Sequence, residues 1–270
     1  MSVQDLVAHG RIAPPLDARR RFLRLTERNV VGYVRAWPVL LTGIVEPFLY
    51  LLSIGIGVGA LVGDVAYAGR LVPYETFVAS GMLATAAMNG AVFDTTFNFF
   101  IRLRYAKLYD AVLATPLEPR DVALGEVTWA LMRGTFYSAA FLVTMAAFGL
   151  TESWWALAAL PVTVLIGAAF ASVGLAGATY LRSFLDFDFV NLAITPMFLF
   201  SATFFPLSQY PDALAAVVRW TPLYQGVALC RALTTGEVHL GLLGHVAYLL
   251  AMVLIGVAVA SRRIDGLLRS

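Results

Sequence analysis

The sequence predicts an all-α integral membrane protein with six transmembrane helices. Hydrophobic residues make up 60% of the 270 residues and charged residues only 13%, and the mean hydropathy is +0.78. A soluble domain has roughly 45–50% apolar and about 25% charged residues, so this composition indicates a membrane protein. The formal net charge of +2 gives no broad basic field, and nucleic acid is therefore not an expected partner.

Six apolar stretches are long enough to cross a bilayer, whose hydrocarbon core of about 30 Å needs roughly 20 helical residues. They cover about 37–62, 76–100, 122–149, 155–181, 189–205 and 240–260. Six spans place both termini on the same side of the membrane. We expect an N-terminal segment, a six-span domain and a short tail, at 1–36, 37–261 and 262–270 respectively. The first residues contain no apolar core of the kind that a cleavable signal peptide has.

The distribution of basic residues predicts the orientation of these spans. Fifteen of the nineteen Lys and Arg residues fall on the side of the termini, three fall on the other side, and Arg133 lies within the third span. Because cytoplasmic loops carry an excess of Lys and Arg, both termini are expected in the cytoplasm. The loop between spans two and three then faces the cytoplasm as well.

An amphipathic helix is predicted over residues 17–36, before the first span. Its apolar face carries Phe22, Leu25, Tyr33 and Ala36. Its basic face carries Arg21, Arg24, Arg28 and Arg35. Such a helix lies along the inner membrane surface. Two roles are open for it: an anchor on anionic lipid, or a clamp that also holds a cytoplasmic partner.

The loop between spans two and three is predicted to hold a short amphipathic helix followed by a stiff turn. One helical face carries Ile101, Tyr105, Leu108 and Val112. Pro116 and Pro119 end this helix and stiffen the chain that leads into span three. A flexible linker is not built in this way. The alternative is a helix that only floats on the lipid surface, and the mixed charge of the segment argues against it.

Residues 206–236 lie on the outer side, between spans five and six, and contain two short helical patterns, DALAAVVRW and YQGVALCRAL. Neither pattern is long enough to cross the bilayer. We expect an outer re-entrant or interfacial helical hairpin that caps the membrane domain. Irregular backbone at such a depth is tolerated only where protein buries it or where it lines water.

The chain carries no motif for energy conversion or catalysis. A P-loop needs a Lys within GxxxxGK[ST], and the only Lys, Lys107, follows Ala106. The three histidines have no HExxH context, and the single Cys230 rules out a CxxC metal site. The string GIGVG at 55–59 lies within a span, where small residues serve close helix packing. No cofactor and no metal are expected on this chain.

Several polar residues lie inside the predicted spans, where ionisable groups are costly and by default indicate function. They are Glu46, Asn89, Asp94, Asn98, Glu126, Arg133 and Asn191. Glu126 and Arg133 share one face of span three, and a structural role as partners for neighbouring helices is the alternative for them. Asp94 and Asn98 are one helical turn apart and are candidates to line a path for polar head groups.

Several stretches give the chain a resemblance to a known family. They are VEPFLYLLSIGIGVG at 45–59, LYDAVLATPLEPRDVALGEVTWALMR at 108–133, FLFSATFFPLSQYPDAL at 198–214 and TPLYQGVALCRAL at 221–233. Over about residues 20–265 the chain resembles the type-2 ABC-transporter permeases. Within that family it is most similar to the nodulation-factor (lipo-oligosaccharide) export permeases and their drug-resistance relatives. The ATPL-x-PRD-x-AL-GE string is a fairly specific part of the likeness.

This resemblance implies a function and partners. Permeases of this family have six spans and work as dimers, so the second chain is expected to be another copy or a related permease. Each copy binds a cytoplasmic ABC ATPase subunit, and the two ATPase subunits carry ATP and Mg²⁺. The outer hairpin closes the exit side. The resemblance implies outward movement of a lipid-linked saccharide, a polysaccharide, a similar glycolipid or an amphipathic drug across the bacterial plasma membrane, with membrane lipid as a further partner.

The resemblance also assigns roles to particular segments. It implies that the loop between spans two and three supplies the coupling helix, with contact residues Arg104, Lys107, Leu108, Tyr109, Asp110 and Leu113. The N-terminal helix makes a second contact through Arg21, Arg24 and Arg28. For a lateral substrate path we expect Asp94, Phe97, Asn98, Phe100, Phe198 and Phe204. An interfacial aromatic belt is the alternative explanation for many of these rings.

Other classes of protein stay open. A drug-efflux permease of the same family is the nearest alternative. A standalone secondary transporter would need broken helices at matching places in two halves, and the halves of this sequence do not match. An integral-membrane enzyme would need catalytic groups that converge at one depth, and the sequence shows none.

Overall fold

A computed structural model gives the structure of residues 21–35, 38, 45, 48–106, 108–113, 115, 117 and 119–268. Predictions for Glu46, Lys107 and Pro116 lie outside the described residues, as do those that depend on the side chains of Asp110 and Leu113. The described chain is almost entirely helical. This agrees with the all-α class that the sequence predicts.

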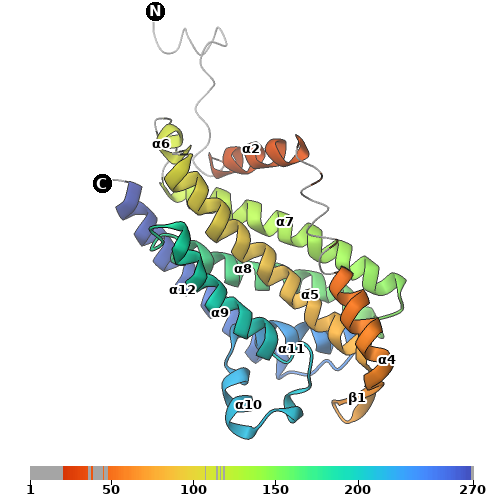
Figure 1. The fold of residues 1–270 in the computed structure, drawn as a ribbon. Coiled ribbons are helices and arrows are strands. Elements are labelled where there is room, and N and C mark those ends of the chain that lie inside the picture. Colours follow the sequence, from red (N-terminus) through yellow and green to blue (C-terminus); the bar gives the residue numbers. More distant parts are fainter. Residues whose placement is uncertain are drawn as a thin grey trace, which may run out of the picture.

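Four helices among the described residues are long and apolar enough to cross a membrane. The first, 74–105, consists of α5 (Tyr74–Phe93), η3 (Asp94–Asn98) and η4 (Ile101–Tyr105). The others are α7 (Pro119–Ala147), η5 (Trp154–Ala158) with α8 (Ala159–Ala178), and α12 (Leu242–Leu268). They correspond to the second, third, fourth and sixth predicted spans. These helices pack side by side in a tilted bundle (Figure 1).

The first and fifth predicted spans are shorter in the described residues. The first is seen as η2 (Leu51–Val58) and α4 (Gly59–Val62), and most of its earlier part lies outside the described residues. The fifth is α9 (Phe187–Phe200), preceded by the single turn η6 (Phe184–Asp186). The 14 residues of α9 rise about 21 Å, less than the roughly 30 Å of a bilayer core. The total of six spans therefore stays a prediction.

Span two changes from an α-helix to wider π-helical turns at η3 and η4. Within η3 the hydroxyl of Thr95 donates a hydrogen bond to the Ala91 carbonyl at 2.8 Å. The hydroxyl of Thr96 donates to the Val92 carbonyl at 2.6 Å. Such hydroxyls compete with the backbone for carbonyls of the preceding turn. Wide turns of this kind are rare and are frequent at functional sites.

A small β-hairpin follows α4, and the hydropathy pattern does not reveal it. Its strands are β1 (Asp64–Tyr67) and β2 (Arg70–Pro73), which pair antiparallel. Ala68 and Gly69 between them have φ of 50° and 79°, as a type I′ turn requires. Ion pairs tie Arg70 to two carboxylates, Glu152 at 2.9 Å and Glu237 at 3.2 Å.

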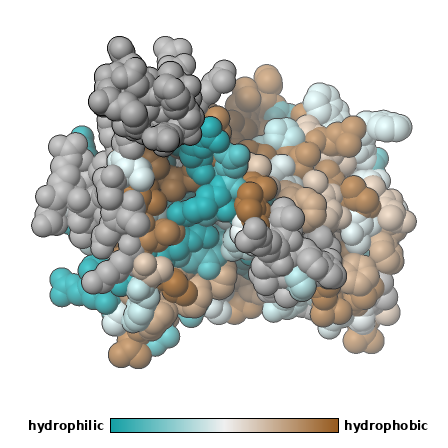
Figure 2. Space-filling view, turned by 90° about the horizontal axis from the view of Figure 1, so that it is seen from above, coloured by the Kyte–Doolittle hydropathy of each residue, from teal (hydrophilic) through white to brown (hydrophobic). Residues whose placement is uncertain are grey.

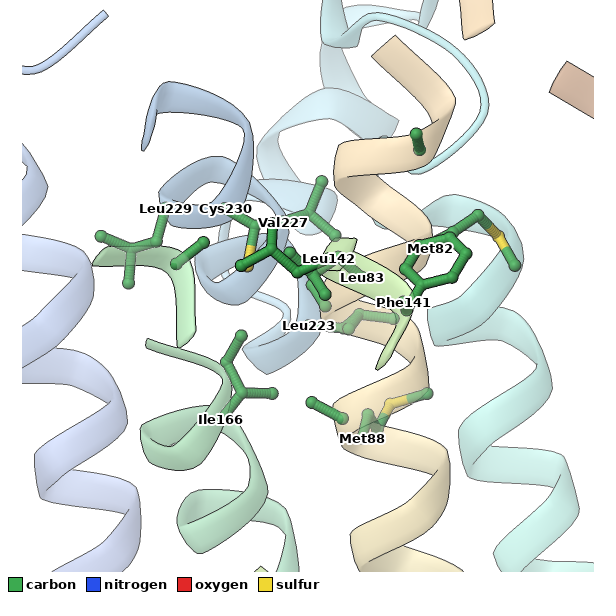
Figure 3. Close-up of a cluster of buried hydrophobic side chains, with 14 of the residues drawn as sticks. Met82, Leu83, Met88, Phe141, Leu142, Ile166, Leu223, Val227, Leu229 and Cys230 are labelled. Atoms are coloured by element: carbon green, nitrogen blue, oxygen red, sulfur yellow. The ribbon is translucent and has the colours of Figure 1, made fainter. Parts of the chain in front are cut away.

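The predicted helical hairpin is present as α10 (Asp212–Arg219) and α11 (Pro222–Thr235), after the turn η7 (Leu207–Gln209). Helix α11 enters the bundle, where it packs against both α5 and α8. Its apolar side chains join a buried cluster (Figure 3): Met82, Leu83, Met88, Phe141, Leu142, Ile166, Leu223, Val227, Leu229 and Cys230. A helix too short to cross the bilayer is thus covered on most sides by protein, as such a depth requires.

Small residues allow the helices to approach closely. A Cβ atom added to Gly226 of α11 would lie 2.8 Å from Cδ1 of Ile166 on α8. One added to Gly256 of α12 would lie 2.8 Å from Cβ of Ser172 on α8. Within the GIGVG string, a Cβ atom on Gly59 would lie 2.9 Å from Oε2 of Glu75. Close packing of this kind is how helices associate where both sides are equally apolar.

Helices α2 (Arg21–Arg35) and α6 (Leu108–Leu113) lie at one end of the bundle, near the last turns of α12 (Figure 1). The strand β1 and helix α10 lie at the opposite end. Helix α2 packs against α7 (Figure 1). Seen from this end, hydrophilic side chains gather in a band between hydrophobic areas (Figure 2).

Candidate functional site

A groove of about 650 Å³ is lined by residues of α5, η3, α7 and α9, together with Tyr50. Pockets of about 300–1,000 Å³ hold drug-sized ligands, so this volume is sufficient for a ligand head group with part of an attached chain. The groove lies between span two, span three and the fifth predicted span. Aromatic, polar and aliphatic side chains line it, and the first two kinds suggest which ligands the groove accepts.

Aromatic rings form one wall of the groove. Phe93 stacks on Phe97 with ring centroids 5.1 Å apart, and Phe97 meets Phe187 edge-on at 5.4 Å. Phe198 also lines the groove and packs edge-on against Phe204 at 5.1 Å. Rings held by such contacts offer large apolar faces at a small entropic cost. They suit the apolar chain of a ligand or the face of a sugar.

Polar side chains form another part of the lining. They are Thr85, Asn89, Thr96, Arg133, Tyr137, Asn191 and Thr195. Asn89 and Asn191 are exposed, and Asn89 lies near the middle of the span 74–105. An amide that faces hydrocarbon without a hydrogen-bond partner is costly, so these groups indicate a surface that meets water or a polar ligand.

A polar layer behind the groove is centred on Arg133 of α7. Its Nη1 contacts Oδ1 of Asp94 at 2.7 Å and donates to the Tyr33 hydroxyl at 3.0 Å. Its Nε donates to the Tyr137 hydroxyl at 2.8 Å. Asn98 donates to Oδ1 of Asp94 at 2.6 Å and to the Tyr33 hydroxyl at 3.3 Å. This layer therefore joins α2, span two and span three through charge-assisted hydrogen bonds.

A second polar layer lies nearer the C-terminal end of span two. It is centred on Glu126 of α7, whose side chain is 3% exposed. Arg28 of α2 lies 3.4 Å from its Oε1, and Asn29 donates to its Oε2 at 3.4 Å. Arg102 of η4 forms an ion pair with the same carboxylate. A buried carboxylate is tolerated when it is paired and hydrogen-bonded in this way. The layer again joins α2, span two and span three.

Helix α2 packs closely on α7 beside these layers. A Cβ atom on Gly125 would lie 2.8 Å from Cβ of Leu25, so only glycine allows this approach. The Thr26 hydroxyl donates to the Gly125 carbonyl at 3.3 Å. The rings of Tyr33 and Trp129 lie 4.8 Å apart. Helix α2 is thus fixed to span three at several positions between Leu25 and Tyr33.

The structure places the six residues of the predicted substrate path in three positions. Phe97 and Phe198 line the groove. Asp94 and Asn98 lie behind it, in the polar layer of Arg133. Phe204 supports Phe198 from a buried position, and Phe100 is fully buried in another cluster. Phe100 and Phe204 therefore contribute packing rather than groove surface in this conformation.

The predicted coupling residues differ in exposure. Arg104 is exposed and Leu108 is partly exposed. Tyr109 is fully buried, and its ring lies 5.4 Å from that of Phe99. In this conformation Tyr109 fixes α6 to the end of span two. Exposed surface for a partner is offered by Arg104 and by Tyr105, which is 60% exposed.

The three arginines of α2 that were predicted to contact the ATPase subunit differ in exposure. Arg24 is exposed and pairs with Glu27 at 2.9 Å. Arg28 reaches inward to Glu126. Arg21, at the first position of the helix, is partly exposed. The basic face of α2 therefore both presents charge outward and joins the second polar layer.

Sequence reasoning missed several residues of the site, among them Tyr33, Phe93, Tyr137 and Phe187. The only signal for Tyr137 was its position four residues after Arg133, the spacing that brings two side chains together on a helix. Phe93 stands in the same relation to Phe97. The role of Tyr33 depends on the docking of α2, which no local pattern reveals. Among the described residues, no three His, Cys, Asp or Glu side chains are grouped as metal ligands.

These features define the class of protein: an integral membrane protein of packed helices, with a groove next to polar layers that reach helix α2. Residues 20–234 match the model of the family described as ABC-2 type transporter. The chain belongs to that family of transporter membrane subunits.

Curated relatives cover most of the chain. It is 34% identical over 236 residues to Nodulation protein J of Rhizobium leguminosarum bv. trifolii. The aligned region covers 87% of this chain and 88% of the relative. It is 34% identical over 225 residues to Nodulation protein J of Rhizobium meliloti (strain 1021), with coverages of 82% and 84%. For Nodulation protein J of Rhizobium leguminosarum bv. viciae, the identity is 32% over 251 residues, with coverages of 90% and 95%.

Proposed function

We propose that this chain is the permease subunit of an ATP-driven exporter that moves an amphipathic substrate, such as a lipid-linked saccharide, outward across the bacterial plasma membrane. One observation carries the proposal. The ligand-sized groove shares Arg133 with a polar layer that runs to the interface helix α2. A conformational change at the end of the bundle that carries α2 and α6 can therefore be transmitted to the groove through a few direct contacts.

The energy source is a separate ABC ATPase subunit that binds ATP and Mg²⁺. The printed sequence has a single Lys and no P-loop around it. We assign the docking surface to the end that carries α6 and α2, with Arg104, Tyr105 and Leu108 as its described contacts. Lys107 belongs to the same proposed surface, although it lies outside the described residues. Arg21 and Arg24 provide a second contact for the ATPase subunit.

The route from this surface to the groove follows named contacts. Tyr109 anchors α6 to Phe99 of span two. Arg102, three residues after Phe99, pairs with Glu126, and Glu126 also pairs with Arg28 of α2. Movement of α6 and α2 by the ATPase subunit would shift span two against span three at Glu126. The layer of Arg133 lies seven residues further along span three and would pass this shift to the groove.

The substrate is assigned to amphiphiles because the groove combines aromatic rings with polar groups. The rings of Phe97 and Phe198 would hold an apolar chain or stack on a sugar, and Asn89 and Asn191 would meet hydroxyl or amide groups. The working unit is proposed to be a dimer with two ATPase subunits and with both termini in the cytoplasm. Surrounding membrane lipid is the medium from which the substrate enters laterally.

The test uses the complex of this chain with its ATPase subunit, purified from native membranes and reconstituted in proteoliposomes. A fluorescent glycolipid is added, and its ATP-dependent movement is followed by chemical quenching of the label on one face. We expect transport that needs hydrolysable ATP. Phe97→Ala with Phe198→Ala should reduce transport severalfold while the complex still assembles. Phe189→Ala is the matched control, because Phe189 is 71% exposed on α9 and lies outside the groove lining.

The coupling part of the proposal has its own variant. Tyr109→Ala with Lys107→Glu should lower substrate-stimulated ATP hydrolysis. Unchanged hydrolysis and transport in a normally assembled complex would refute it. Transport that persists without ATP would indicate a secondary transporter. Stimulation of ATP hydrolysis by a hydrophobic drug, but not by the glycolipid, would favour the drug-efflux permease.

A further inference from the structure

Arg133 is the only charged residue among the described residues that line the groove. A lone guanidinium in a membrane groove would attract anionic head groups, including those of ordinary anionic lipids. Its side chain is only 9% exposed, so little water is available to screen its charge. The selectivity of the groove therefore depends on what balances this charge.

Asp94 supplies that balance from behind the groove wall. Its side chain is 4% exposed, does not line the groove, and lies 2.7 Å from Nη1 of Arg133 through Oδ1. Asn98 fixes the same oxygen with a hydrogen bond of 2.6 Å. The pair has no net charge, and the other residues that line the groove are uncharged.

The neighbouring charged groups lie in the second polar layer and not in the groove lining. Arg102 pairs with Glu126, and Arg28 reaches the same carboxylate, so both cations are engaged in the second polar layer. Neither of them lines the groove. The second carboxylate oxygen of Asp94, Oδ2, is buried, and no hydrogen-bond partner is found for it among the described residues. The carboxyl group of Asp94 therefore contacts Arg133 through Oδ1 and does not face the groove.

We infer that Asp94 determines the charge preference of the groove, because it cancels the charge of Arg133 and so selects an amphiphile whose polar head is uncharged. The inference rests on the proposed function, since it assumes that the groove holds an amphiphile. It adds a substrate class: a neutral, hydroxyl- or amide-rich head on an apolar chain. Anionic phospholipids are excluded, which keeps the groove free in a membrane full of them.

The test compares two probes with the same apolar chain, dodecyl maltoside with a neutral sugar head and dodecyl phosphate with an anionic head. The whole chain is placed in nanodiscs of phosphatidylcholine, and binding of each radiolabelled probe is measured against empty nanodiscs. We expect the wild-type chain to prefer the maltoside. Asp94→Asn keeps the shape of the side chain and an acceptor for Arg133 but removes the charge. It should shift the preference toward the phosphate by about tenfold or more.

The double variant Asp94→Asn with Arg133→Gln restores a neutral groove and should return the preference to the maltoside. An Asp94→Asn chain that is folded, as judged by its thermal unfolding, and keeps the wild-type preference would overturn the inference. A wild-type preference for the phosphate would also overturn it, while leaving the amphiphile groove intact. If Ala86→Trp, which places a large ring in the groove, changed the binding of neither probe, the proposed groove itself would fail.

Discussion

Arg231 of α11 and Phe77 of α5 are joined by a cation–π contact and by hydrogen bonds. The guanidinium carbon of Arg231 lies 3.6 Å from the centroid of the Phe77 ring, and Nη2 donates a hydrogen bond to the Phe77 carbonyl at 3.1 Å. Nη2 also donates to the carbonyl of Ala202 at 2.9 Å. No carboxylate pairs with Arg231 in the described part of the chain, and the residue is 3% exposed. A ring and backbone carbonyls therefore solvate this charge, and they tie α11 to span two and to the end of α9.

Replacing Arg231 with Met should destabilise the protein, because the carbonyls of Phe77 and Ala202 would lose their donor inside the bundle. We expect a loss of roughly 2–4 kcal/mol in the free energy of unfolding. Thermal unfolding can be followed with a thiol-reactive dye, since the only cysteine, Cys230, is buried beside Arg231. Arg219→Met is the matched control, because Arg219 is exposed at the end of α10. Equal unfolding temperatures for the two variants would contradict the structural role of Arg231.

Replacing Glu126 alone should destabilise the protein more than replacing Glu126 and Arg102 together. Glu126→Met leaves two guanidinium groups without their buried counter-charge and should cost about 2–4 kcal/mol of stability. The change of Glu126 to Met together with Arg102 to Met should cost less than the sum of the single variants, because the charges leave in pairs. Denaturation of the purified chain in detergent measures this cycle. Simple additivity would show that the two residues act independently.

Hydropathy was sufficient to predict the bundle but not the contacts within it. The spans at 76–100, 122–149, 155–181 and 240–260 were predictable because about 20 apolar residues in helix match the bilayer core. The spacing of Glu126 and Arg133 put them on one face of span three. Their partners could not be predicted, because these depend on how neighbouring helices rotate and dock.

The chain separations show why local patterns were insufficient. The partner of Arg133 is Asp94, 39 residues away, and Tyr33, 100 residues away, bonds to the same guanidinium. Tyr109 was predicted to contact a partner because of the family resemblance, yet it is fully buried. The β-hairpin was hidden for a different reason. Its turn places Ala68 at a positive φ, which alanine rarely adopts, so the usual Asn-Gly or Gly-Gly signal was missing.

Tyr109→Ala should loosen α6 from the end of span two. Removing a fully buried aromatic side chain costs about 3–5 kcal/mol when the site cannot collapse. Here we expect the loss to fall mainly on α6, because Tyr109 packs against Phe99 at the edge of the bundle. Hydrogen exchange of residues 108–113 measures it, and their protection should fall. Tyr105→Ala is the control, because Tyr105 is 60% exposed and its loss should leave that protection nearly unchanged.

Gly226 and Ile166 offer a test of how α11 is seated. Gly226→Ala would bring a methyl group to 2.8 Å from Cδ1 of Ile166, so the variant should be less stable by roughly 1–3 kcal/mol. The contact is with the far end of a side chain, and Ile166→Ala removes that end. Gly226→Ala with Ile166→Ala should therefore be more stable than Ile166→Ala alone, because the new methyl group partly fills the cavity. A double variant less stable than both single variants would contradict this packing.

Gly125 and Gly134 lie on the same helix, and their substitution should have opposite effects. A Cβ atom on Gly125 would meet Cβ of Leu25 at 2.8 Å and the Phe22 carbonyl at 3.0 Å, so Gly125→Ala should push α2 away from α7. Nothing lies within 4 Å of a Cβ atom on Gly134. Gly134→Ala should therefore stabilise α7 by up to about 1 kcal/mol through its better helix propensity. Hydrogen exchange of α2 distinguishes them: protection should fall in the Gly125 variant only, and a fall in neither would mean that α2 is not held by this contact.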